Sequence, residues 1–275
     1  MGYLMQVVEA NGARIPIIGL GTWDLRGRDC ARLTEQAIGI GYRHIDTAQM
    51  YGNEAAVGDG VRASGRRDEV IVTTKIKPEN LAPRELERSV KESLAQLRMS
   101  EIDLLLIHWP NPRVPLAETI GALCKVKRAG MARHIGVSNF TVKLLDEAVK
   151  LATEPLVCNQ IECHPYLDQS KVIAACSRHG MAAIAYSPMA KGGATDDAVL
   201  ARIGKAHGKT AAQVCLRWLA QQDIAVIPRT SRIERLSENF AIFDFELSAA
   251  DMKEIAGLAR SGGRIVDWSW SPKWD

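Results

Sequence analysis

The stretch "VIVTTKIKPENLAPRELERSVKESLAQLRMSEIDLLLIHW" (residues 70–109) contains an apolar run, a longer amphipathic segment and a second apolar run. The two apolar runs, 70–76 and 103–109, are almost uninterrupted, which is typical of parallel strands covered on both faces. Between them, residues 82–99 carry apolar side chains every three or four positions, which predicts a helix with one buried face. The stretch therefore predicts a strand–helix–strand unit with parallel strands.

The same alternation extends along the whole chain. A second helical segment, 115–130, ends in a glycine, and further strand-like runs lie at residues 15–21, 42–46, 133–139, 157–162, 181–187 and 224–228. Eight strands alternating with helices, without a Pro-, Gly- or Ser-rich linker, predict an α/β fold, the (β/α)8 TIM barrel, as a single domain over residues 1–275. A doubly wound sheet is the competing fold. Its GxGxxG phosphate fingerprint is not matched, because "GLGTW" (19–23) stops after two glycines.

Asn11 and Gly12 lie between two short β-prone runs in "VVEANGARIP" (7–16). An Asn-Gly pair in this position is the strongest short-range signal for a β-hairpin. We therefore expect an N-terminal hairpin ahead of the barrel, closing its bottom.

The composition gives no support to several classes of protein. The 275 residues carry a net charge of +3 without a basic block, so we expect no binding to nucleic acid or to a membrane surface. No apolar run approaches the ~20 residues of a membrane span, and the N-terminus has no signal-peptide pattern. The six cysteines lack CxxC spacing and are typical of reduced core residues. We expect a cytoplasmic monomer.

Four polar side chains fall at the carboxyl ends of three consecutive predicted strands, where barrel enzymes carry their chemistry. Asp46 ends the second strand, Lys75 closes the third and His108 closes the fourth, while Tyr51 follows Asp46 in the loop. Each has an ordinary structural explanation, as a helix cap, a rim charge, a core histidine or a packing tyrosine. Together at one barrel mouth they predict a catalytic group. Because an unpaired ammonium is costly in a low-dielectric site, Asp46 is the expected partner of Lys75.

Eight short motifs, in this order along the chain, resemble the motif set of the aldo-keto reductases. They are "GLGTW", "HIDTAQMYGNEAAVG", "TTKI", "LLLIHWP", "IGVSNF", "NQIECHP", "AYSP" and "IPRTSRIERLSENF". The resemblance covers essentially the whole chain and is strongest to the bacterial 2,5-diketo-D-gluconate reductases. It implies an NADPH-dependent oxidoreductase that reduces small-molecule carbonyls to alcohols: aldehydes, dicarbonyls such as methylglyoxal, or keto-sugar acids.

The resemblance also implies that Asp46, Tyr51, Lys75 and His108 form a catalytic tetrad. A carbonyl that accepts hydride at carbon needs a proton at oxygen, and Tyr51 can donate it. A free phenol, with a pKa of about 10, is a reluctant acid near neutrality. We expect the ammonium of Lys75 to lower the pKa of Tyr51. Asp46 holds Lys75, and His108 orients the carbonyl oxygen.

The cofactor residues follow from the same resemblance. Tyr186 is expected to stack under the nicotinamide, and Ser138, Asn139 and Gln160 to hold its carboxamide. The ribose side falls to Gly21, Thr22 and Asp46, and the rest of the NADPH/NADP⁺ site to Ser187, Met189, Pro228, Arg229, Thr230, Ser231, Arg235, Glu238 and Asn239. Structural explanations stay open: Tyr186 as core, Asn139 and Gln160 as partners of strand-end backbone groups, and Arg235 as the ion-pair partner of Glu234 or Glu238.

Substrate is expected to contact Tyr51, His108 and an apolar wall formed by Trp23 and Trp109. Core packing is an alternative for Trp109. The tail "VDWSWSPKWD" (266–275) carries three more tryptophans. It either folds over the mouth and touches substrate or only fastens the chain end to the barrel.

Three rival functions use the same fold. Lys75 could be the nucleophile of a Schiff-base aldolase, although that leaves Tyr186 and Asn139 unexplained. The barrel could serve a non-catalytic interaction protein. A metal-dependent hydrolase is the weakest rival. Cys158, Cys163 and His164 lack a second matching ligand pair, and strand one has no His-x-His, so we expect no metal.

Overall fold

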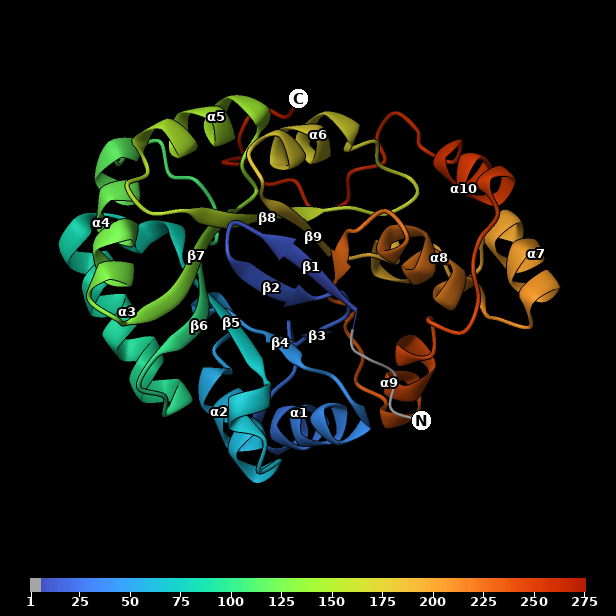
Figure 1. Ribbon diagram of the computed structural model, residues 1–275, viewed down its shortest axis with the longest axis horizontal. Coiled ribbons are helices and arrows are strands. Elements are labelled where there is room, and N and C mark those ends of the chain that lie inside the picture. The colour runs from blue at the N-terminus through green and yellow to red at the C-terminus, as the bar shows by residue number, and fades with distance from the viewer. Residues whose placement is uncertain (1–5) are drawn as a thin grey trace.

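Eight parallel strands form the wall of a closed barrel in the computed structural model, which describes residues 6–275 (Figure 1). In spatial order they are β3 (Leu20–Gly21), β4 (His44–Asp46), β5 (Ile71–Ile76), β6 (Ile102–Ile107), β7 (Ala132–Ser138), β8 (Leu156–Glu162), β9 (Ala182–Tyr186) and β10 (Ala225–Val226). Parallel bridges from Ile18 to Val226 and from Gly21 to Arg229 join the first strand to the last. The predicted (β/α)8 barrel is therefore confirmed.

Helices surround the strands on the outside of the barrel, as Figure 1 shows. They are α1 (Gly27–Ile40), α2 (Glu54–Ala63), α3 (Pro83–Leu97), α4 (Leu116–Arg128), α5 (Val142–Leu151), α6 (Ser170–Arg178), α7 (Ala198–His207), α8 (Ala211–Ala220), α9 (Ile233–Phe240) and α10 (Ala249–Ala256). The two helices predicted at 82–99 and 115–130 are α3 and α4. Helix α3 begins with Pro83 in its first turn and ends where Arg98 takes a left-handed conformation (φ 54°).

Two apolar layers explain why the strands read as nearly continuous apolar runs. Along β6, Leu104 and Leu106 face the barrel interior, where they pack with residues such as Val157 and Ile184. Their neighbour Leu105 faces the helices and belongs to the outer layer. Successive side chains of a strand point to opposite faces, so a strand buried on both sides needs apolar residues at both.

The predicted hairpin closes the bottom of the barrel. Strands β1 (Val7–Ala10) and β2 (Ala13–Pro16) pair antiparallel and lie across the barrel axis in Figure 1. Ala10, Ala13 and Ile15 pack against the interior layer. No helix within residues 6–275 combines the length and the apolar character needed to cross a membrane. The first five residues, on which the prediction of no signal peptide partly depends, lie outside the described residues.

The first predicted strand, 15–21, is wrong as a single element. Ile15 and Pro16 belong to the hairpin, Ile18 makes a single bridge to Val226, and Leu20 and Gly21 form the strand of the barrel wall. The chain bends at Ile17, between the bottom and the wall, and Gly19 lies in the wall beside His44. A Cβ at Gly19 would stand 2.8 Å from His44 Nδ1, so only glycine fits so close to the neighbouring strand.

Asn11 fastens the hairpin turn to the barrel. Its Nδ2 donates to the carbonyl oxygens of Leu156 (2.8 Å) and His179 (3.0 Å), and its φ is 46°. Asn11→Ala should lower the free energy of unfolding by about 1–3 kcal/mol, because it removes both bonds and strains a left-handed position. Asn11→Gly removes the bonds without the strain, so its loss should be smaller by ~1 kcal/mol. Urea denaturation measures both; a larger loss for Asn11→Gly contradicts the assignment.

Candidate active site

Three strand ends bring the predicted tetrad together at the mouth of the barrel. Asp46 is the last residue of β4, Lys75 the penultimate residue of β5, and His108 directly follows β6. Asp46 and Lys75 are 1% and 0% exposed, and Lys75 Nζ lies 2.5 Å from Asp46 Oδ1. The predicted pairing of this ammonium with this carboxylate is present in the structure.

Lys75 makes two further contacts. Its Nζ donates to the carbonyl oxygen of Thr47 at 2.9 Å and to Tyr51 Oη at 3.3 Å. A chain of contacts thus leads from Asp46 through Lys75 to Tyr51. The ammonium holds all three of its protons toward acceptors, so burial is compensated by hydrogen bonds as well as by charge.

Tyr51 reaches Lys75 because a buried asparagine fixes the loop that carries it. Tyr51 ends a short 3₁₀ helix, Gln49–Tyr51. Just beyond it, Asn53 Nδ2 donates to the carbonyl oxygens of Thr22 (2.8 Å) and Leu25 (3.0 Å), and Asn53 Oδ1 accepts from Thr47 Oγ1 (2.6 Å). Sequence reasoning missed Asn53. The signal was a short polar residue directly after the Tyr-Gly pair, in a loop expected to be exposed but here 3% exposed.

The protonation states of the tetrad follow from burial and from the neighbouring charges. Burial lowers the pKa of Lys75, but Asp46 and Tyr51 outweigh it and the net pKa is raised. Burial raises the pKa of Tyr51, Lys75 lowers it and Asp46 raises it, with a net rise. Lys75 does lower the pKa of Tyr51, as expected. Burial raises that pKa by more, so the expected net fall in the pKa of Tyr51 is wrong. At neutral pH the pair is an ammonium and a neutral phenol.

His108 is neutral at the same mouth. Burial and the charge of Lys75 lower its pKa well below the ordinary value. Its ring meets that of Tyr51 edge-on, with centroids 5.6 Å apart. Its Nδ1 has no hydrogen-bond partner within residues 6–275. A neutral imidazole with one N–H can donate a single hydrogen bond into the space beside Tyr51.

A hydrogen-bond network extends from Asp46 to the ends of β7, β8 and β9. Gln160 Nε2 donates to Asp46 Oδ2 (2.7 Å), and Ser138 Oγ donates to the carbonyl oxygen of Gln160 (2.8 Å). Tyr186 Oη donates to Asn139 Oδ1 (2.8 Å), and Asn139 Nδ2 donates to the carbonyl oxygen of His108 (3.0 Å). The four residues predicted to hold a nicotinamide are thus neighbours, connected to the tetrad through two of its members.

The remaining predicted cofactor residues lie on either side of β10. The Gly21 amide donates to the carbonyl oxygen of Pro228 (3.0 Å), and Thr22 Oγ1 donates to that of Asp46 (2.9 Å). Arg229 Nε donates to the carbonyl oxygen of Trp23 (3.2 Å). On the other side of β10, after β9, Ser187 takes a left-handed conformation, φ 49°, and half-buried Met189 precedes the 3₁₀ turn Ala190–Gly192.

Helix α9 presents an arginine without a partner. Arg235 is exposed and makes no ion pair with any residue from 6 to 275, so the alternative pairing with Glu234 or Glu238 is not observed. Glu238 instead accepts from Thr210 Oγ1 at 2.8 Å. Four residues further along the chain than Arg235, Asn239 is 3% exposed. In the turn before the helix Ser231 is exposed, and Thr230 Oγ1 accepts from the Arg232 amide at 3.0 Å.

The two predicted wall tryptophans differ in exposure. Trp109, next to His108, is 4% exposed and packs edge-on against Trp270 (5.2 Å) and Trp274 (6.0 Å) of the tail. Trp23 is 54% exposed, and the ammonium of Lys191 lies 5.8 Å from its ring centroid. The tail therefore packs against Trp109 beside the mouth, and contact of its rings with substrate stays a prediction.

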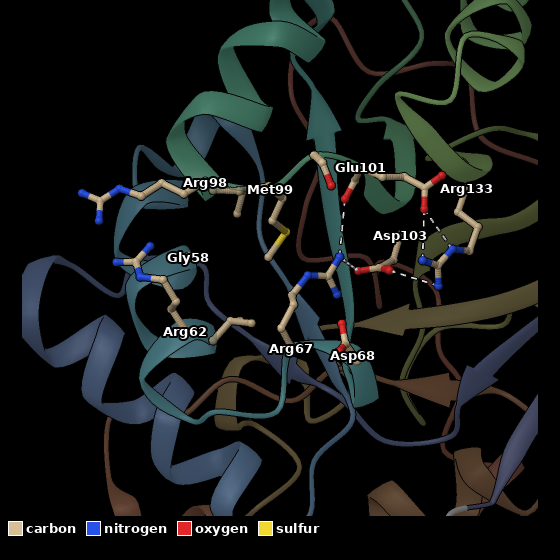
Figure 2. Close-up of a pocket in the computed structure, with 12 residues that line it drawn as sticks. Gly58, Arg62, Arg67, Asp68, Arg98, Met99, Glu101, Asp103 and Arg133 are labelled. Carbon is tan, nitrogen blue, oxygen red and sulfur yellow. Dashed lines mark hydrogen bonds and ion pairs between the residues drawn. The ribbon is translucent and has the colours of Figure 1, made fainter.

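A separate pocket of about 360 Å³ opens near the amino ends of β5, β6 and β7, at the opposite end of the barrel (Figure 2). Its arginines are already paired. Arg67 lies 2.8 Å from Asp103, and Arg133 lies 3.4 Å from Asp103 and 3.0 Å from Glu101. Because Asp103 is 2% exposed and also accepts from the Val72 amide, this cluster is a structural network of the barrel bottom.

Comparisons with known proteins agree with this geometry. The sequence model of the Aldo/keto reductase family matches residues 17–260. The chain is 42% identical over 265 residues to methylglyoxal reductase DkgB of Escherichia coli O157:H7, covering 95% of this chain and 99% of the relative. A crystal structure assigned as a 2,5-diketo-D-gluconic acid reductase B is similar with a TM-score of 0.97 and 48% identity, over 99% of this chain and 98% of that one. The aldose reductase of Schistosoma japonicum gives a TM-score of 0.88 and 29% identity, over 94% of each chain.

The pairing of Lys75 with Asp46 can be tested by stability alone. Lys75→Met leaves a buried carboxylate without its counter-ion and should cost about 3–5 kcal/mol of unfolding free energy. Asp46→Asn/Lys75→Met removes both charges, so it should be more stable than the Lys75→Met single variant. Chemical denaturation of the wild type, both single variants and the double variant gives the coupling energy. Simple additivity of the two losses would mean that the two charges do not interact.

Proposed function

Because the chain belongs to the aldo/keto reductase family, we propose that it reduces small aldehydes, dicarbonyls or keto-sugar acids to alcohols with NADPH, with Tyr51 as the proton donor. The family makes it an oxidoreductase that acts on carbonyl groups. The observation that carries the rest is the buried chain from Asp46 through Lys75 to Tyr51 Oη, which ends at the open mouth of the barrel.

The proton comes from a neutral phenol. The pKa of Tyr51 is raised, so the phenol is fully protonated at neutral pH and can donate a hydrogen bond to a carbonyl oxygen. As negative charge develops on that oxygen, it becomes a far stronger base than the phenolate that Tyr51 leaves behind. Lys75 at 3.3 Å then stabilises the phenolate, and Asp46 keeps Lys75 in place. The ammonium therefore acts on the product of proton transfer more than on the resting phenol.

His108 orients the substrate. Its lowered pKa keeps it neutral, so it donates a hydrogen bond to the carbonyl oxygen without competing with Tyr51 as an acid. Tyr51, from the loop after β4, and His108, from the end of β6, then both donate to one oxygen. This fixes the carbonyl and stabilises the charge that forms on it.

The residues around the tetrad fit a nicotinamide cofactor. When bound, reduced nicotinamide supplies the hydride. Gln160 Nε2 is fixed on Asp46 Oδ2, while its side-chain oxygen has no partner within residues 6–275 and would be an acceptor for the amide of a nicotinamide. Tyr186 is half-buried and anchored by Asn139, which leaves a ring face as a platform. Arg235 is exposed and has no ion pair within residues 6–275. Its guanidinium is therefore suited to bind the extra phosphate of NADPH.

The structure argues against two of the three rival functions, the Schiff-base aldolase and the non-catalytic interaction protein. A Schiff-base lysine must lose its proton, whereas Lys75 is fully buried, ion-paired and has a raised pKa. A non-catalytic interaction protein would have no use for a buried ammonium aimed at a phenol. Keeping a charged pair inside a barrel is costly unless the pair has a chemical role or excellent geometry.

The substrate class is supported by the names of the relatives. One is called a methylglyoxal reductase and another is assigned as a 2,5-diketo-D-gluconic acid reductase B. Both names describe small carbonyl compounds with a second carbonyl group. A panel of aldehydes, methylglyoxal, diketo-gluconates and ketoses, followed by the loss of NADPH absorbance, identifies the substrate; no turnover of any member contradicts the proposal.

Tyr51→Phe removes the proton and leaves the ring in place. Turnover of an unactivated aldehyde should fall by about 10²–10⁴-fold, the range typical of a lost general acid, with NADPH affinity nearly unchanged. Steady-state kinetics and a fluorescence titration of NADPH measure the two effects. Retention of near-normal turnover would exclude Tyr51 as the donor, and a parallel loss of NADPH affinity would point to a binding role.

Arg235→Ala should weaken NADPH binding by about ten- to a hundredfold and leave NADH binding almost unchanged, because only NADPH carries a phosphate for the guanidinium to contact. Arg232→Ala is the matched control. It removes an exposed arginine three positions earlier that already has a carboxylate, Glu234, 3.9 Å away. Titration of both cofactors into all three proteins by fluorescence quenching gives the affinities. Equal losses of affinity for NADPH and NADH in Arg235→Ala would contradict a phosphate-binding role for Arg235.

A further inference from the structure

Helix α3 carries two serines on its buried face. Ser89 and Ser93 are one turn apart and 0% exposed, whereas the other buried residues of the helix are leucine and valine. Serine is a weaker helix former than alanine or leucine, and a buried hydroxyl is costly unless it is hydrogen-bonded. These two positions therefore need polar partners from outside the helix. Asn80 supplies one of them, because its Nδ2 donates to Ser89 Oγ at 2.7 Å.

Gln49 supplies the second partner, and it is the first residue of the 3₁₀ helix that carries Tyr51. Its Nε2 donates to the carbonyl oxygen of Ser89 at 2.9 Å and to Ser93 Oγ at 3.2 Å. Its Oε1 accepts from the amide of Lys77, directly after β5, at 3.3 Å. Both ends of the amide group thus have partners. Gln49 connects the start of the 3₁₀ helix to α3 and to the end of β5.

Ser93 also contacts the chain that follows Tyr51. Glu54, the first residue of α2, is buried, and its Oε1 accepts from Thr74 Oγ1 at 2.6 Å. Burial raises the pKa of this carboxyl, and hydrogen bonds from Thr74 and Ser93 lower it by less, so the net pKa is raised. One hydroxyl of α3 therefore contacts the chain both before and after Tyr51.

The backbone of the 3₁₀ helix gives Tyr51 little support. The Tyr51 amide donates to the carbonyl oxygen of Ala48 (3.0 Å), and the Gly52 amide donates to that of Gln49 (3.1 Å). A single 3₁₀ turn has poor hydrogen-bond geometry and is weak without tertiary contacts. The proposed proton transfer nevertheless requires the phenolic oxygen to stay near Lys75 Nζ, 3.3 Å away. The turn therefore depends on its side chains for a fixed position.

We propose that Gln49 is a positioning residue for Tyr51: through its contacts with α3 it holds the phenolic oxygen beside Lys75 and the substrate carbonyl. Asn53 fixes the chain after Tyr51, and Gln49 fixes the turn before it. Because α3 lies outside the barrel wall, the effect of Gln49 on the reaction passes through the phenol. A misplacement of about 1 Å can cost on the order of a hundredfold in rate. This inference rests on the proposed reductase function.

Gln49→Met keeps the length of the side chain and removes its hydrogen bonds to α3 and to the Lys77 amide. We expect kcat for an unactivated aldehyde to fall about tenfold, while KM and NADPH affinity change by less than about twofold. Steady-state kinetics and a fluorescence titration of NADPH measure these values. Gln96→Met, the same change at an exposed position of α3, is the control and should leave kcat unchanged. A loss of NADPH affinity as large as the loss of kcat contradicts the positioning role.

A comparison in the Tyr51→Phe background separates positioning from general damage to the barrel. Without the hydroxyl group there is no proton to position, so adding Gln49→Met should lower the residual turnover of Tyr51→Phe by less than about twofold. A structural role alone would lower the turnover of the wild type and of Tyr51→Phe by the same factor. Single-turnover measurements at high enzyme concentration give all four rates. Equal factors in the two backgrounds overturn the inference and leave the reductase proposal intact.

Hydrogen exchange tests the support of the turn without turnover. Gln49→Met should speed exchange at the Tyr51 and Gly52 amides about tenfold and leave the amides of β5 unchanged, because only the turn loses its contact with α3. Unchanged exchange at these two amides rejects the inference whatever the activity. If the wild type reduces no member of the carbonyl panel, the reductase proposal fails. The placement of Tyr51 by Gln49 is then judged by exchange: faster exchange in Gln49→Met supports it, and unchanged exchange rejects it.

Discussion

The ammonium of Lys75 lies fully buried in the barrel wall, 2.5 Å from Asp46 Oδ1. Such a charge is stable only if every proton has an acceptor and a carboxylate lies alongside, because isolated burial would cost far more than the whole stability of the domain. Much of the local structure meets that requirement. Asp46 divides its oxygens between Lys75 and Gln160, Thr47 offers its carbonyl oxygen, and Tyr51 completes the set. Tyr51 Oη is therefore one of the acceptors that stabilise the buried ammonium of Lys75.

The barrel supplies this arrangement because parallel strands end at one level. Asp46, Lys75 and His108 come from adjacent strands, so their separation is fixed by strand spacing rather than by loops. Only Tyr51 needs a loop, and the side chain of Asn53 fixes that loop through four hydrogen bonds within the described residues. Rigid placement matters more than acid strength here. The phenol has a raised pKa, so under the proposed mechanism its proton moves only when the substrate oxygen becomes basic.

Much of the fold could be predicted from the sequence because both signals, apolar runs and amphipathic helices, are local. The strand ends then placed Asp46, Lys75 and His108 without any knowledge of distances. What depends on long-range contacts could not be predicted in this way. The predicted first strand is divided between the hairpin and the wall, and position 19 needs glycine because His44 of the neighbouring strand leaves no room for a Cβ. The pKa of Tyr51 was misjudged because the sequence shows which charges are near but not how much water is excluded.

The end of β8 contacts both the buried ion pair of Asp46 and Lys75 and the C-terminal tail. Gln160 faces Asp46 in the barrel, and two residues later Glu162 holds the tail, as side chains two apart on a strand point the same way. Glu162 also stands beside Tyr186 in the register of β8 and β9. One strand end therefore contacts three groups: the buried carboxylate of Asp46, the expected nicotinamide platform Tyr186 and the C-terminal tail. The tail is attached near its start by the backbone amides of Ile265 and Val266, and at its end by the side chain of Asp275, which accepts from the first turn of α5.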